Sequence, residues 1–186
     1  MRFFQECFEY FEETNKAQIS TSQTSEWLMD NFYVIEQAVR QVEQDLPADY
    51  YQRLPKTRDG WVRIQLLAVA NTRRGEARLE VEQIRHFLQL FQDITPLDTG
   101  ELWALPLMLR LTVLESLAEA LSSVTKLKWD AISLPGLIDE VVDSSNLQAD
   151  PDLIVANSIL NLRLLATQDW KAFFESTSVL EKILRR

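Results

Sequence analysis

Apolar residues recur along most of this chain at the spacing of an α-helix, and no segment shows the sustained alternation of apolar and polar residues, rich in β-branched side chains, that is typical of a strand. The helical period is clearest in residues 3–16, where Phe4, Phe8 and Phe11 follow one another on a single face. Later segments repeat the pattern as far as the C-terminal stretch. The periodicity therefore predicts an all-α fold without a sheet.

Proline, glycine and polar residues divide the pattern into separate helices. The segment 151–166 is apolar almost all round, which favours a central position in a bundle. We expect one compact domain, 1–186, of seven or eight helices, with 1–20 a peripheral aromatic helix and 126–149 an irregular connector. The predicted helices are 3–16, 26–46, a short turn within 48–60, 60–72, 79–93, 100–124, 136–143, 151–166 and 169–184.

Residues that favour helix N-termini precede several of these segments. Thr24 or Ser25 is the expected N-cap of 26–46, and Asp98 or Thr99 that of 100–124. Asp150 is expected to cap 151–166, where a proline occupies the favoured first position.

Charge and composition exclude several classes of protein. The net charge of −9 argues against general nucleic-acid binding, which needs Lys and Arg to neutralise phosphates. A single cysteine, Cys7, permits no intrachain disulfide and fits a reducing compartment. No apolar run approaches the roughly 20 residues of a membrane span, and the N-terminus is a poor signal peptide. We therefore expect a cytoplasmic protein.

The chain offers little catalytic chemistry. His86 is the only histidine, and its flanking position on an apolar stripe is typical of a structural or surface residue. Asp150 and Asp152 resemble the acid pair that many glycosyltransferases use to hold a metal, but this pair opens a helix rather than ending a strand. Both carboxylates suit an N-terminus, so we interpret them as capping groups. We predict no catalytic residue, no metal site and no cofactor.

The stretch ELWALPLMLRL, 101–111, places a proline and an arginine inside an apolar helix. Pro106 removes a backbone donor and should bend the helix. A buried Arg110 without a partner would be too costly. We therefore expect Arg110 to reach solvent or a carboxylate, Asp30 first.

Three blocks together resemble the region that precedes the glycosyltransferase domain in cyclic β-1,2-glucan synthases. They are SEWLMDNFYVIEQAVRQVEQDLPADYYQRLPK (25–56), DITPLDTGELWALPLMLRLTVLESLAEAL (93–121) and VANSILNLRLLATQDWKAFFESTSVLEKILRR (155–186), and they occur in the family's order. The segment 126–149 matches weakly, and TRDGWVRIQ (57–65) is shorter than the family's loop.

The resemblance implies a helical module of a UDP-glucose-dependent glucan synthase, and it carries no catalytic motif onto this chain. The module would scaffold, dock or regulate a glycosyltransferase domain of the same or a companion chain, on the cytoplasmic side of the inner membrane. The residues carried over as matching positions, structural or docking in role, are Trp27, Asp30, Asn31, Glu101, Trp103, Pro106, Arg110, Asp169 and Trp170.

Two other functions remain open from the residues. The chain could be an independent module that binds a protein partner through an exposed aromatic face. It could also bind glucan by stacking sugars on aromatic side chains, for which the candidates are Trp27, Tyr50, Tyr51, Trp61 and Trp129.

Overall fold

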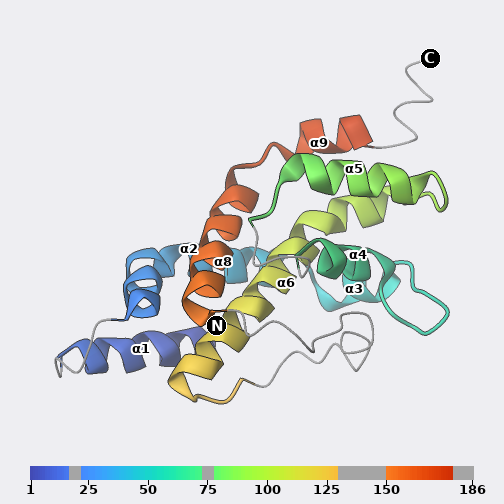
Figure 1. The fold of residues 1–186 in the computed structure, drawn as a ribbon. Coiled ribbons are helices and arrows are strands. Elements are labelled where there is room, and N and C mark those ends of the chain that lie inside the picture. Colours follow the sequence, from blue (N-terminus) through green and yellow to red (C-terminus); the bar gives the residue numbers. More distant parts are fainter. Residues whose placement is uncertain (17–21, 73–77, 130–149, 178–186) are drawn as a thin grey trace.

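The computed structural model describes residues 1–16, 22–72, 78–129 and 150–177, and in these ranges the chain folds into eight helices (Figure 1). The expected number of helices and the all-α class are confirmed. The described residues contain no strand, only an isolated bridge between Lys56 and Val62. The helices are α1 (Arg2–Lys16), α2 (Gln23–Asp45), α3 (Ala48–Arg53), α4 (Arg63–Thr72), α5 (Val81–Gln92), α6 (Thr99–Thr125), α8 (Pro151–Thr167) and α9 (Trp170–Thr177).

The expected helix at 136–143 and most of the connector 126–149 lie outside the described residues, as does the end of the helix expected at 169–184. The single domain spanning 1–186 therefore stays a prediction.

Helix α6 occupies the centre of the fold, where we had expected 151–166. It packs against α1, α2, α4, α8 and α9, and most of its residues are buried on every side. Helix α8 is buried along one stripe only, with Leu153 and Arg163 exposed. The expectation failed because both helices are apolar all round, and apolarity alone does not show which of the two is central.

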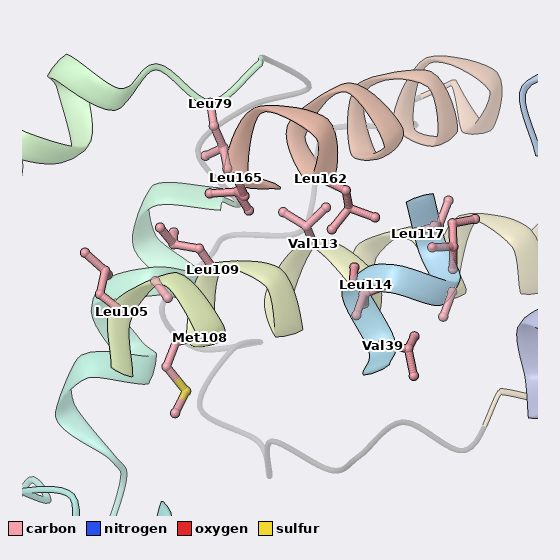
Figure 2. Close-up of a cluster of buried hydrophobic side chains, with 14 of the residues drawn as sticks. Val39, Leu79, Leu105, Met108, Leu109, Val113, Leu114, Leu117, Leu162 and Leu165 are labelled. Atoms are coloured by element: carbon pink, nitrogen blue, oxygen red, sulfur yellow. The ribbon is translucent and has the colours of Figure 1, made fainter. Parts of the chain in front are cut away.

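The core lies where α2 and α8, which also contact each other, pack on α6. Figure 2 shows Leu162 and Leu165 of α8 next to Leu109 and Val113 of α6, with Val39 of α2 further along the same cluster. The α6–α8 contact is the most extensive between any two described helices. These two helices therefore form the frame on which the other elements lie.

Helix α1 lies against α2 and α6, and its aromatic stripe is covered within the chain. Phe4 and Phe11 are buried, and Phe8 packs on Phe32 with ring centroids 4.7 Å apart. The stripe therefore does not form an exposed contact surface. The peripheral position expected for 1–20 stays a prediction.

Local capping sets the start of the central helix. Asp98 is its N-cap and accepts a hydrogen bond from the Glu101 amide at 2.7 Å, while the Glu101 carboxylate accepts from the Asp98 amide at 2.9 Å. This reciprocal pair is a capping box, and it confirms one of the two expected caps. The helix continues unbroken past Pro106, and the bend at that residue stays a prediction.

Helix α2 begins earlier than expected, because Ser22 rather than Thr24 or Ser25 is its N-cap. Thr24 is instead fully buried, and both its amide and its hydroxyl donate to the Asp152 carboxylate of α8. Asp150 caps α8 as expected, accepting from the Asp152 amide at 3.0 Å. Asp152 therefore serves two helix N-termini, its own and that of α2.

Candidate functional site

The nine positions that the resemblance singles out fall into three places in the fold. One group lies on α2, one residue joins α4 to α6, and the largest group surrounds the corner where α6, α8 and α9 meet. The groups are Trp27, Asp30 and Asn31 on α2, Glu101 at the start of α6, and Trp103, Pro106, Arg110, Asp169 and Trp170 at the corner.

The α2 group joins that helix to α8. The Asn31 amide nitrogen donates to the carbonyl of Trp27 at 2.8 Å, and the guanidinium of Arg163 on α8 donates to the Asn31 amide oxygen. Asn31 is buried, whereas Asp30 is exposed. Asn31 therefore has a clear packing role that explains its place among the matched positions.

Glu101 is a fully buried carboxylate with a cationic partner. The Nε of Arg63 donates to its Oε1 at 2.7 Å, and an Arg63 terminal nitrogen pairs with Oε2. The same guanidinium donates to the carbonyl of Pro96 at 3.2 Å. This bidentate pairing raises the Arg63 pKa, chiefly through the hydrogen bond to Glu101. Glu101 thus ties together α4, the loop before α6 and the first turn of α6.

Arg110 does not pair with Asp30, and that expectation is wrong. The Arg110 guanidinium is buried and donates to two backbone carbonyls, that of Pro106 at 3.2 Å and that of Leu165 on α8 at 2.8 Å. Burial lowers the Arg110 pKa, and the charge of Asp45 acts in the opposite direction. We expected a carboxylate because a buried cation needs compensation, but two backbone carbonyls supply it here, one of them in the last turn of α8.

The carbonyl of Leu165 also accepts from the indole nitrogen of Trp170 at 3.0 Å. Leu165 lies in the last turn of α8, where carbonyls lack intrahelical donors. Asp169 then begins α9 by accepting from the Ala172 amide at 3.0 Å. Arg110, Trp170 and Asp169 therefore shape the connection between α8 and α9.

An aromatic cluster extends from this connection to the surface. It begins with Trp170, whose ring lies 5.3 Å from that of Phe173 and 6.2 Å from that of Phe174, measured between centroids. Trp103 of α6 continues the cluster, with its ring centroid 4.8 Å from that of Phe174. Arg85 of α5 lies over the Phe173 ring at 5.5 Å. We call Trp103, Trp170, Phe173 and Phe174 the aromatic cluster.

Trp103 is the member of the cluster that faces solvent. The residue is 56% exposed, the largest value among the five tryptophans of the chain. Phe173 and Phe174 are buried beneath it. A large, rigid ring that is supported on one side and exposed on the other is a typical contact residue.

Four of the five aromatic residues first considered as sugar platforms, namely Trp27, Tyr50, Tyr51 and Trp129, pack against the core, and Trp61 is half-buried. The hydroxyl of Tyr50 donates to the carbonyl of Gly100 at 2.8 Å, and that of Tyr51 donates to the side chain of Gln65. Trp129 packs on Phe3 of α1, with ring centroids 4.9 Å apart. The structure thus favours Trp103 as the aromatic contact residue, although the sequence singled it out only through the resemblance.

Other candidate residues have structural roles or none that the structure shows. His86 is exposed on α5. Cys7 is fully buried, and burial raises its thiol pKa to about 11, so it is poorly suited to nucleophilic chemistry. Asn161 of α8 accepts from the Leu79 amide at 2.8 Å and so anchors the start of α5. Within the described ranges, no His, Cys, Asp and Glu side chains gather as a metal site, and no helix is long and apolar enough to span a membrane.

Comparison with known proteins finds sequence similarity to part of a larger protein. No family model matches the chain. The chain is 35% identical over 105 residues to a protein named cyclic beta-(1,2)-glucan synthase NdvB, from Rhizobium meliloti strain 1021. The match covers 55% of this chain and only 4% of that relative. The chain is therefore similar to a small region of a cyclic β-1,2-glucan synthase, as its three sequence blocks indicated.

Proposed function

We propose that this chain is a non-catalytic helical domain that docks on a glycosyltransferase domain engaged in β-1,2-glucan synthesis. The observation that carries the proposal is the 35% identity to part of NdvB, whose name describes such a synthase. The glycosyltransferase domain would belong to the same chain or to a companion chain. The complex would lie on the cytoplasmic side of the inner membrane.

The bonds that Asp150, Asp152 and Glu101 make within the fold support a non-catalytic role. Asp150 and Asp152 bind helix N-termini, and Glu101 is committed to Arg63 and to the amide of Asp98. A carboxylate oxygen that accepts such bonds has fewer lone pairs left to bind a metal or to accept a proton. The purified chain is therefore expected not to transfer glucose from UDP-glucose. Transfer that is abolished by Asp152→Ala would contradict this.

Trp103 is the proposed centre of the docking contact. It is exposed, it is supported by a rigid layer of aromatic rings, and it lies in the second of the resembling blocks. Tryptophan is enriched among the residues that dominate binding energy at protein interfaces. Loss of such a residue commonly costs about 2 kcal/mol, which is about a 30-fold change in Kd.

The test is binding of the purified chain to the glycosyltransferase region of a cyclic β-1,2-glucan synthase from the same genome. Trp103→Ala should weaken binding by about 30-fold or more. The matched control is Ile94→Ala, since Ile94 is 86% exposed and lies outside the aromatic cluster. Absence of binding, or equal binding by both variants, would refute the proposed docking surface.

Glucan binding is a second candidate, favoured by the half-exposed Trp103 ring, because aromatic faces stack on sugar rings. Titration with linear and cyclic β-1,2-glucan, followed through tryptophan fluorescence, distinguishes the two functions. A glucan response that is lost in Trp103→Ala, without binding to the glycosyltransferase region, would replace docking by glucan recognition. Binding to neither would leave the independent interaction module as the better explanation.

A further inference from the structure

The connection between α8 and α9 is held by a hydrogen-bond arrangement that joins distant parts of the chain. The carbonyl oxygen of Leu165 accepts from Arg110 at 2.8 Å and from the Trp170 indole at 3.0 Å. One donor comes from the middle of α6 and the other from the first residue of α9. A single carbonyl therefore fixes three helices relative to one another.

Charge and position favour a cation at this point. The last turn of a helix carries carbonyls without intrahelical donors and the negative end of the helix dipole. Arg110 supplies a buried positive charge there, together with a planar group that also reaches the Pro106 carbonyl of its own helix at 3.2 Å. A lysine would place one compact donor group where the arginine presents a fork, so it could not reproduce both bonds equally well.

The arrangement continues into the aromatic cluster. Trp170 is held by the Leu165 carbonyl, its ring packs on Phe174, and the Phe174 ring supports Trp103. The orientation of the exposed ring thus depends on a series of contacts that begins at Arg110. Three members of this series, Arg110, Leu165 and Phe174, are buried.

We propose that Arg110 is a positioning residue that, through the Leu165 carbonyl and Trp170, holds α9 in place and thereby shapes the aromatic cluster. Arg110 itself does not contact a ligand of this surface. The inference deepens the proposed function by naming the residue that shapes its docking surface. Its test measures amide exchange rather than binding, so the two succeed or fail separately.

In a simpler alternative, Arg110 only stabilises the contact between α6 and α8, and this alternative makes a different prediction. Loss of that stabilisation should increase opening of α6, α8 and the helices packed on them to a similar extent. Loss of a positioning residue should increase opening mainly in α9, because α6 and α8 keep their extensive apolar contact.

The experiment is native-state amide hydrogen exchange on the full chain. Arg110→Met should raise the exchange rates of residues 170–177 by about tenfold relative to those of 155–162, a size typical of lost coupling between contacting residues. The matched control is Arg163→Met, which makes the same change on α8 but removes a bond to α2 instead. That control should leave α9 unchanged.

A second variant tests whether Arg110 acts through Trp170. Trp170→Phe keeps a ring and removes the indole donor. When it is combined with Arg110→Met, the rise in the exchange rates of α9 should be smaller than the product of the two separate rises. If Arg110→Met does not fold, Arg110→Lys takes its place and should show a smaller rise at the same residues. Equal rises in α2, α6, α8 and α9, or fully independent effects of the two substitutions, would overturn the inference.

Discussion

Replacing the buried carboxylate of Glu101 by an amide should strongly destabilise the fold. Glu101 is fully buried, accepts from two nitrogens of Arg63 and accepts from the Asp98 amide at 2.9 Å. In Glu101→Gln, one carboxylate oxygen becomes an NH2 group, which cannot accept any of these bonds. The substitution also leaves the Arg63 charge without its counter-charge.

The magnitude follows from the burial of the two partners. Removing one member of a buried ion pair costs about 3–5 kcal/mol. The Arg63 side chain retains 23% exposure, so water partly compensates its charge and the expected cost is about 2–4 kcal/mol. In a chain of this length, 3 kcal/mol corresponds to a fall in Tm of about 6–12 °C.

Thermal and urea unfolding followed by far-ultraviolet circular dichroism measures this cost. Glu82→Gln is the control, because Glu82 forms an exposed ion pair with Arg85 that should contribute under about 1 kcal/mol. A double-mutant cycle gives the decisive result. In an Arg63→Met background the Glu101 carboxylate is buried without a cation, so Glu101→Gln should cost little or should stabilise. An equal cost in both backgrounds would refute the reasoning.

Three further predictions concern other contacts. The Cys7 pKa rises from 9.0 in the unfolded chain to about 11 in the fold. The stability that the protonated thiol contributes is therefore complete below pH 9 and falls by about 2–3 kcal/mol as the pH rises to 11. Cys7→Ala should remove that part of the pH dependence of urea unfolding. Asp152→Ala should cost about 1–2 kcal/mol in the same assay, because it removes two bonds from Thr24 and a charge at two helix N-termini, and a change under about 0.3 kcal/mol would contradict the shared cap. Lys126 ends α6 with a φ of 63°, so Lys126→Gly should raise the free energy of unfolding by about 0.5–1 kcal/mol, whereas a loss would show that this backbone is not strained.

The α6–α8–α9 corner shows which parts of the candidate site the sequence could reveal. The resemblance brought Trp103, Arg110 and Trp170 to attention as matching positions, but it assigned none of them a contact. Their proximity depends on Leu165, a residue with no distinctive side-chain chemistry, which acts through its backbone carbonyl. Every residue has a backbone carbonyl, so the sequence does not indicate which one accepts a hydrogen bond. For this reason Asp30 appeared to be the better partner for Arg110.

The sequence by itself determined the features that depend on neighbouring residues. Apolar periodicity placed the helices, and short-range capping chemistry placed the start of α8 at Asp150 and limited that of α6 to Asp98 or Thr99. Tertiary structure alone decided which helix is central, that Asp152 accepts hydrogen bonds from the first turn of α2 across 128 positions, and that Arg110 meets Leu165 across 55. A cap is formed within one turn of its own helix, whereas the partner of a buried charge depends on which helices become neighbours when the whole core packs.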